Sequence, residues 1–189
     1  MNTIEKTHST AWALRTMNWA ERVLPDSQYG FRRNRSTIDA VFVILSLIQH
    51  ALNNHEQLII VLVDFKKAFD TIDRKTLWTK IKMLGVSDKV LQVFEKCFSE
   101  IHGCLKNNDG SLSETVKFLR GVKQGDPCSP VFFTLMLHDL EQSLKDIQGY
   151  RMGLATILTV LFADDTTIVA TSIADAQKQL DAMKEYAKK

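Results

Sequence analysis

The feature that most constrains this chain is a short apolar run that ends in a carboxylate, Leu58 to Asp64. Its six apolar residues are rich in β-branched side chains and too few for a helix, so they predict a strand buried on both faces. A charge inside such a strand would carry a large desolvation cost. We therefore expect Asp64 at the rim of a sheet, where water or a cation can reach it.

A second element of the same kind lies near the end of the chain. Residues 157–163 and 166–171 read as two strands of a hairpin, with Asp164 and Asp165 at the tip. If this hairpin pairs alongside the first strand, three carboxylates converge at one end of one sheet. Aspartate is also common in hairpin turns, and Asp64 taken alone is better interpreted as a solvated strand end. The pattern by itself leaves a turn and a metal site open.

Composition limits the class of protein. With 189 residues and 45% hydrophobic content, the chain can bury a core and is expected to form one domain, or one domain with a sub-domain. A net charge of +2 does not by itself indicate a polyanionic partner. Cys97, Cys104 and Cys128 lack the paired spacing of a zinc site and predict isolated, mostly buried thiols in a reducing compartment. No apolar run reaches the roughly 20 residues of a membrane span, and no signal peptide is recognisable, so we expect an intracellular protein without a membrane partner.

The rest of the chain predicts mainly helices. Asp73 is expected to be a helix cap rather than a metal ligand, and Gly30 is expected in an arginine-rich loop. The apolar residues of 38–52 fall on one helical face. We expect helices over residues 2–24, 36–52, 73–85, 87–101, 129–144 and 172 to the C-terminus. Residues 107–110 are expected to form the turn of a small hairpin.

Strands separated by helices predict an α+β domain, with an antiparallel-rich sheet and helices on one face. Clustered carboxylates would repel one another without a cation. Two divalent ions about 4 Å apart can serve phosphoryl transfer, and magnesium prefers such hard oxygen ligands. The sequence therefore indicates metal-assisted chemistry on a phosphate-rich substrate.

Four segments in order resemble a known family. The segments Asp64–Asp70, Gly121–Pro130 and Phe162–Asp165 resemble the three central palm motifs of reverse transcriptases, and Gln28–Thr37 resembles a fingers segment of the non-LTR retrotransposon branch. The likeness runs from about Pro25 to the final helix. It implies a polymerase palm-like antiparallel sheet packed on helices over residues 58–189, without a thumb, and a partial helical fingers segment with connecting helices over residues 1–57.

The resemblance implies RNA-directed DNA polymerase activity. A primer 3′-hydroxyl would attack the α-phosphate of a deoxynucleotide, so the implied partners are an RNA template, a DNA primer and dNTPs. The implied cofactor is Mg²⁺, as two ions, with Mn²⁺ as a possible substitute. Asp64 and Asp164 would be the principal ligands, with Asp165 beside them, and the backbone carbonyl of Phe65 would help to bind metal.

The resemblance also implies nucleotide contacts. Phe69 matches the bulky residue beneath the sugar, where it would clash with a 2′-hydroxyl; the pattern alone would make it an ordinary core phenylalanine. Gln124 and Gly125 match a loop that contacts the incoming nucleotide and the template, and Arg32 would meet nucleotide phosphates. The remaining contacts to nucleic acid, which could equally be solvated surface charges, would be Arg33, Arg35 and Lys123.

Three departures from the family pattern are visible. Lys123 and Asp126 replace the commonest proline and serine of the second palm motif, and Phe162 replaces a tyrosine. The chain also shows neither the first fingers motif nor a thumb. One alternative is therefore a catalytically silent module, derived from a reverse transcriptase, that binds nucleic acid or another protein. A third hypothesis is another two-metal phosphoryl transferase or nuclease.

Overall fold

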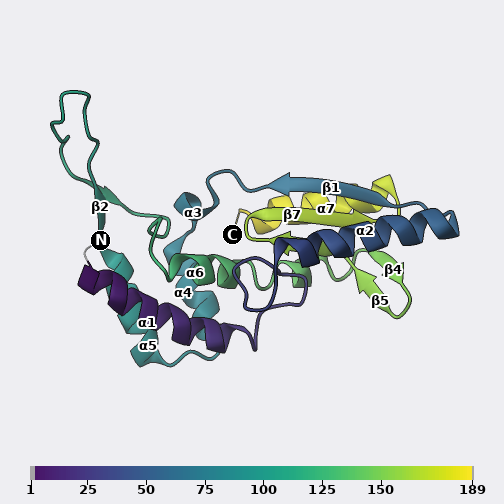
Figure 1. Cartoon of the computed structure of the whole chain (residues 1–189), viewed down its shortest axis with the longest axis horizontal. Coiled ribbons are helices and arrows are strands. Elements are labelled where there is room, and N and C mark those ends of the chain that lie inside the picture. The colour runs from purple at the N-terminus through teal and green to yellow at the C-terminus, as the bar shows by residue number, and fades with distance from the viewer. Residues whose placement is uncertain (1–2, 189) are drawn as a thin grey trace. The chain divides into compact units, whose positions relative to one another are not determined.

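The computed structural model describes residues 3–188 (Figure 1). Helices alternate with short strands along the chain, as the hydrophobic pattern predicts. In chain order the elements are α1 (Thr3–Ala20), α2 (Thr37–Asn54), β1 (Ile59–Asp64), α3 (Ala68–Thr71), α4 (Arg74–Met83), α5 (Asp88–Ser99), β2 (Ile101–Gly103), β3 (Val116–Phe118), α6 (Ser129–Met136), the 3₁₀ helix η1 (Glu141–Leu144), β4 (Tyr150–Met152), β5 (Ala155–Ile157), β6 (Thr159–Phe162), β7 (Asp165–Ala170) and α7 (Ile173–Tyr186).

The chain forms two compact units. The first contains the chain up to Ala13 together with Lys67–Met136, and the second contains Leu14–Lys66 together with the chain from Leu137 onward. Each unit is therefore built from two separate stretches of sequence. The predicted division into partial fingers (1–57) and palm (58–189) is a division by function, and the two compact units do not test it. It stays a prediction.

The second unit is built on a three-stranded antiparallel sheet in the order β1-β7-β6. Strands β6 and β7 form the predicted hairpin, and β7 pairs along the whole of β1, from Ile59 opposite Ala170 to Asp64 opposite Asp165. The hairpin therefore does pair alongside the first strand, which is the condition under which the sequence places the carboxylates at one end of one sheet.

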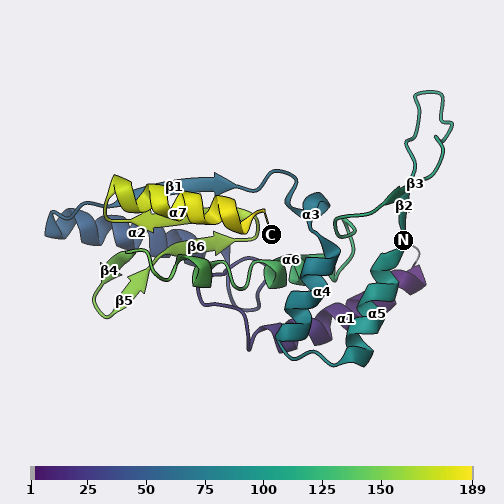
Figure 2. The same ribbon diagram turned by 180° about the vertical axis from the view of Figure 1, so that it is seen from behind.

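Helices cover both faces of this sheet, not one face as the sequence predicts. Ile168 packs with Met183 of α7, whereas the next residue, Val169, packs with Leu47 and Ala51 of α2. Successive residues of a strand point to opposite faces, so α7 and α2 lie on opposite sides of β7. Figures 1 and 2 show α2 in front in one view and α7 in front in the other.

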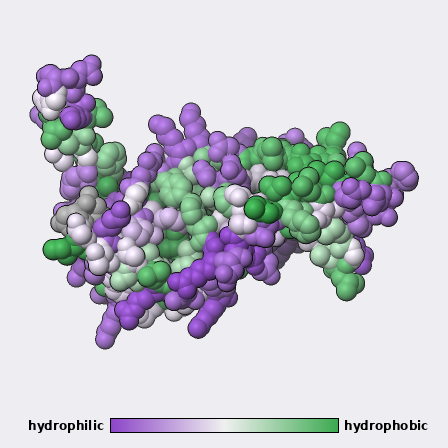
Figure 3. Space-filling view, viewed as in Figure 1, coloured by the Kyte–Doolittle hydropathy of each residue, from purple (hydrophilic) through white to green (hydrophobic). Residues whose placement is uncertain are grey.

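Strand β1 is not buried on both faces. It is the edge strand, and Leu62 is 79% exposed because α2 packs over β7 and β6 instead. Helix α2 itself buries a narrow stripe, Ala40, Leu47 and Ala51. Its wider apolar face is exposed, and Figure 3 shows apolar colour over α2 and β1; that face consists of Ile38, Val41, Phe42, Leu45, Ile48 and Leu52.

The first unit has an aromatic core around Phe132 of α6. Its ring lies 5.0 to 5.3 Å, centroid to centroid, from the rings of Trp78, Phe94 and Phe98 on α4 and α5. The Asp73 carboxylate accepts a hydrogen bond from the Thr76 backbone N–H (2.8 Å), which confirms the predicted cap of α4. The predicted turn at 107–110 lies in the ribbon that joins β2 to β3.

Some element boundaries differ from the prediction. Helix α1 ends at Ala20, before Leu24, and the expected start at Asn2 lies outside the described residues. The helix expected over 129–144 ends at Met136, and Leu144 belongs to η1. All three cysteines are free, but Cys97 and Cys104 are exposed and only Cys128 is buried.

Candidate functional site

The carboxylates predicted to bind metal lie at one end of the sheet in the second unit. Asp64, the last residue of β1, is directly opposite Asp165, the first residue of β7. Directly opposed residues of an antiparallel pair project from the same face, so these two carboxylates share a side of the sheet. Both are exposed. The expectation that Asp64 lies at the rim is confirmed.

Asp164 lies in the tight turn between β6 and β7. The turn has two residues, Ala163 and Asp164, between the paired residues Phe162 and Asp165. Ala163 has a φ of +57°, a left-handed conformation that costs a residue with a side chain about 1–2 kcal/mol. Strained backbone of this kind recurs where a protein must hold a functional group in place. The strain lies immediately before the Asp164 carboxylate.

The three carboxylates are available to a ligand. Within residues 3–188, no hydrogen bond or ion pair involves the side chain of Asp64, Asp164 or Asp165. In the same part of the chain, no group of three or more His, Cys, Asp and Glu side chains is placed to hold a metal ion by itself. The arrangement fits an ion that takes most of its ligands from water and substrate, as magnesium commonly does, rather than a closed protein site.

Phe65 follows Asp64 directly and anchors the end of β1. Its half-buried side chain packs against the core cluster that contains Leu161 and Ile168. The side chain therefore fixes the backbone at the point where the sequence predicts a metal-binding carbonyl.

The predicted basic residues of the second unit differ in their availability. The side chain of Arg32 is 5% exposed, and its guanidinium donates to the Glu21 carboxylate (2.8 and 3.0 Å) and to the Pro25 carbonyl (2.7 Å). The guanidinium of Arg35 donates to Asp26 and lies over the Tyr29 ring. Arg33 is exposed, and no ion pair of its side chain occurs in the part of the chain that the structure describes. Of the three, Arg33 presents its guanidinium to a polyanion most freely.

The predicted nucleotide-binding residues of the first unit line one pocket. Phe69, Gln124 and Gly125 form part of the wall of a pocket of about 390 Å³, together with Pro127 and Pro130. The ring of Phe69 stacks on Phe133 with a centroid distance of 4.8 Å and an interplanar angle of 24°. The structure therefore brings Phe69 together with Gln124 and Gly125, which follow it by more than 50 positions in the sequence.

Local contacts hold the loop around Gln124. Its side-chain amide donates to the Asp70 carboxylate (2.9 Å), and the Val122 N–H donates to the Phe69 carbonyl (2.9 Å). Gly125 has a φ of +81°, a conformation that suits glycine and leaves the backbone open to a ligand. The loop is thus tied directly to the segment that carries Phe69.

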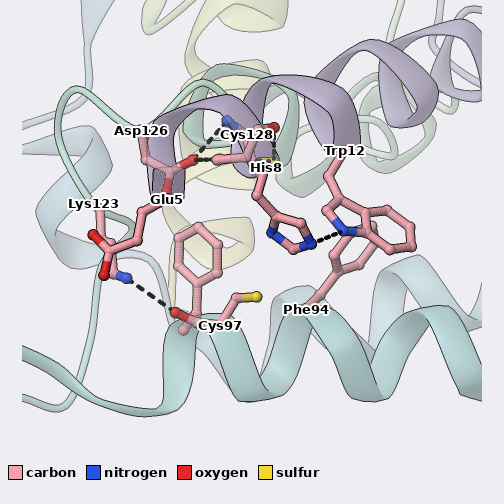
Figure 4. A pocket seen from close by; sticks show the side chains of 10 residues that line it. Glu5, His8, Trp12, Phe94, Cys97, Lys123, Asp126 and Cys128 are labelled. Atoms are coloured by element: carbon pink, nitrogen blue, oxygen red, sulfur yellow. Dashed lines mark hydrogen bonds between the residues drawn. The ribbon is translucent and has the colours of Figure 1, made fainter. Parts of the chain in front are cut away.

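The two unusual residues of this loop make structural contacts. Asp126 is buried, and its carboxylate accepts hydrogen bonds from the Ser9 hydroxyl and the Cys128 backbone N–H (Figure 4). The ammonium group of Lys123 donates to the Cys97 carbonyl (3.1 Å). Burial raises the pKa of the Cys128 thiol to about 11, so this cysteine is protonated at neutral pH.

The sequence does not predict one part of the carboxylate end. Its pattern places Gln28 and Gly30 in an arginine-rich loop, but both residues lie against the turn that contains Asp164. A single buried glutamine leaves no periodic hydrophobic pattern in the sequence. No pattern in the residues around Gln28 predicts these contacts.

Comparison with known proteins identifies the family. Residues 6–189 match the family model described as reverse transcriptase (RNA-dependent DNA polymerase). The chain belongs to this family. It is 28% identical over 171 residues to the Pol polyprotein of the R2DM retrotransposable element of Drosophila melanogaster, and 30% identical over 175 residues to the RNA-directed DNA polymerase of the jockey element of Drosophila funebris. The predicted likeness to non-LTR reverse transcriptases is confirmed.

These relatives are much longer than this chain. The alignments cover 90% and 89% of the chain but only 16% and 18% of the two relatives. Among solved structures, the chain resembles telomerase from Candida albicans (TM-score 0.62, 18% identity, 94% of this chain and 31% of that one) and telomerase from Candida tropicalis (TM-score 0.63, 17% identity, 95% and 30%). The structural likeness supports the predicted palm-like α+β fold.

Reverse transcriptases as a family use divalent metal ions and bind nucleic acid. In the described part of this chain, no helix is both long and apolar enough to span a membrane.

Proposed function

We propose that this chain carries the polymerase site of an RNA-directed DNA polymerase, which adds deoxynucleotides to a primer 3′-hydroxyl on an RNA template. The observation that carries the proposal is the pairing of Asp64 with Asp165, with Asp164 in the adjoining turn, in a member of the reverse transcriptase family. The carboxylates would hold two Mg²⁺ ions, for which Mn²⁺ could substitute. These ions, when bound, would activate the attacking hydroxyl and stabilise the charge on the leaving pyrophosphate.

The donor set suits this role. Carboxylate oxygens are hard ligands, and those of Asp64, Asp164 and Asp165 are not engaged by other groups in residues 3–188. The Phe65 carbonyl would add a further oxygen next to Asp64. Without a cation, the two opposed carboxylates repel each other. A bound cation would remove this cost.

The pocket of the first unit would receive the nucleotide. The ring of Phe69, held by its stack on Phe133, would lie beneath the sugar and disfavour a 2′-hydroxyl. Gln124 would be fixed by its bond to Asp70, and Gly125 would let the nucleotide approach the backbone closely.

The basic residues would have different parts. We assign the template or primer backbone to Arg33, whose side chain is exposed. Phosphate contacts by Arg32, Arg35 and Lys123 would require each to exchange a hydrogen bond that it makes within the protein.

Primer extension on an RNA template tests the function. The assay uses Mg²⁺ with deoxynucleotides or ribonucleotides, and compares wild type, Asp164→Asn and Asp146→Asn. Asp146 is an exposed aspartate of the same unit and is not one of the three proposed ligands, so its variant removes one surface charge without touching that set. We expect Mg²⁺-dependent extension by wild type and Asp146→Asn, with deoxynucleotides preferred, and none by Asp164→Asn. Equal extension by all three proteins would refute the assignment.

The same proteins separate the alternatives. A silent nucleic-acid-binding module would bind RNA in a salt-sensitive manner, equally well with and without the Asp164 carboxylate, and would extend no primer. A nuclease of the two-metal type would cleave single-stranded or duplex nucleic acid without adding nucleotides.

A further inference from the structure

A short segment at the start of the arginine-rich loop, Ser27–Tyr29, extends the carboxylate-bearing sheet. The Leu161 N–H donates to the Ser27 carbonyl (2.8 Å), and the Tyr29 N–H donates to the Leu161 carbonyl (2.7 Å). Gln28 thus pairs in parallel with Leu161 on β6, on the side away from β7. This pairing directs the segment toward the turn that contains Asp164.

Gln28 is buried beside that turn. It is 1% exposed, and its side-chain oxygen accepts hydrogen bonds from the Gly30 N–H (2.9 Å) and the Ala163 N–H (3.3 Å). Its side-chain nitrogen has no partner among the described residues. Burying the unpaired nitrogen of this amide costs free energy. The two hydrogen bonds that the side-chain oxygen accepts offset this cost and give a reason for a glutamine at this buried position.

The residue that Gln28 contacts is the strained one. Ala163 is 7% exposed and has a φ of +57°. Its N–H stands outside the β6–β7 ladder, which closes at Phe162 and Asp165. Without Gln28, the N–H of Ala163 would be buried and unpaired. A rearrangement of the turn that exposed this N–H to water would then lower the free energy.

Gly30 closes the other side of the turn. A Cβ atom at Gly30 would lie 2.1 Å from the Ala163 nitrogen and 2.8 Å from its Cα. No side chain fits in this space, so the backbone of Gly30 rests directly on the turn. Together, Gln28 and Gly30 leave Ala163 little room for another conformation.

We propose that Gln28 and Gly30 are positioning residues, which hold the Ala163–Asp164 turn so that the Asp164 carboxylate is presented to a divalent cation. The proposal rests on the proposed function, because it assumes that Asp164 binds metal. Neither residue touches substrate or metal. Both act through the backbone of Ala163.

Mn²⁺ binding to the full chain tests the proposal without depending on catalysis. The EPR signal of the free ion measures how much Mn²⁺ is bound. Wild type is compared with Gln28→Met and with a matched control, Gln179→Met. Gln179 is also fully buried in the second unit with one unpaired amide atom, and it donates to the Val169 carbonyl (3.1 Å) rather than to the turn. We expect Gln28→Met to weaken Mn²⁺ binding at least about tenfold, as loss of a supporting partner commonly does, and Gln179→Met to leave it unchanged.

Gly30→Ala provides a second variant should Gln28→Met fold poorly. Its control is Gly149→Ala, whose Cβ would lie 2.7 Å from the Ile157 carbonyl oxygen, a comparable backbone clash away from the carboxylates. We expect only Gly30→Ala to weaken Mn²⁺ binding. In metal-free protein, hydrogen exchange of the Ala163 amide should also accelerate in Gln28→Met and stay slow in Gln179→Met.

The outcomes separate this inference from the proposed function. If Asp164→Asn binds Mn²⁺ as wild type does, the proposed metal site is wrong. If binding depends on Asp164 but is the same in wild type, Gln28→Met and Gly30→Ala, the metal site stands and the positioning role is wrong. If Mn²⁺ binding weakened equally in each variant and its control, the positioning role would also be wrong, because the weakening would then come from a general loss of stability.

Discussion

Asp64 lies directly opposite Asp165 in the ladder between β1 and β7, so two like charges face each other on one side of the sheet. In metal-free protein this pair is destabilising, and Asp64→Asn should raise the free energy of unfolding by about 0.5 kcal/mol. Urea denaturation in the presence of a chelator measures the change, which should shrink at high salt because ions screen exposed charges. A clear loss of stability would show that the carboxylates do not repel each other.

Phe69 should control the choice of sugar. Phe69→Val removes the ring that lines the pocket with Gln124, and we expect discrimination against ribonucleotides to fall about tenfold or more. Phe133→Val removes the ring on which Phe69 stacks but leaves the pocket wall itself unchanged, so we expect a smaller change from this variant. The measurement is the ratio of ribonucleotide to deoxynucleotide incorporation. A ratio that changes equally in both variants would assign Phe69 to packing alone.

Two glycines of one loop should respond differently to alanine. Both Gly121 and Gly125 have a φ of +81°, so each alanine should cost about 1 kcal/mol of strain. A Cβ at Gly121 would also lie 2.7 Å from the Asp70 carbonyl oxygen, whereas nothing lies within 4 Å at Gly125. Urea denaturation should therefore show a clearly larger loss of stability for Gly121→Ala. Equal losses would indicate that the loop does not pack against Asp70.

Tyr150 should make stability depend on alkaline pH. Burial and the hydrogen bond that its hydroxyl donates to Glu56 (2.6 Å) raise the pKa of Tyr150 to about 12. An unfolded tyrosine ionises near pH 10, so the contribution of Tyr150 is complete below pH 10 and is lost as the pH rises from 10 to 12. The stability advantage of wild type over Tyr150→Phe, on the order of 1 kcal/mol, should shrink across this window. Denaturation midpoints at pH 8 and pH 11 test it, and a constant difference would contradict it.

The sequence predicts the core of the fold because its signals are local. An apolar run that ends in Asp64, a hairpin with acids at its tip and cap residues such as Asp73 each determine structure within a few residues. The pairing of β7 with β1 joins distant strands, and the sequence offers it only as the condition for bringing the carboxylates together. The order of the palm motifs identifies the family, and the geometry at Asp64 agrees with it.

Other features depend on contacts that no local pattern specifies. Helix α2 has a wide apolar face that a sequence reading would assign to the core, yet it buries Leu47 and two alanines and exposes Phe42. Leu62 is exposed because β1 is an edge strand, which periodicity does not reveal. The contact of Gln28 with Ala163 joins residues 135 positions apart, and nothing near Gln28 predicts it.

Mn²⁺ titration of Asp164→Asn tests whether the Asp64 end of the sheet binds divalent metal. We expect wild type and the exposed-charge control Asp146→Asn to bind Mn²⁺ with the same affinity, and Asp164→Asn to bind at least about tenfold more weakly with its fold unchanged. Undiminished Mn²⁺ binding by a folded Asp164→Asn protein would show that the carboxylate in the β6–β7 turn has no part in holding metal, and the proposed metal site would be wrong.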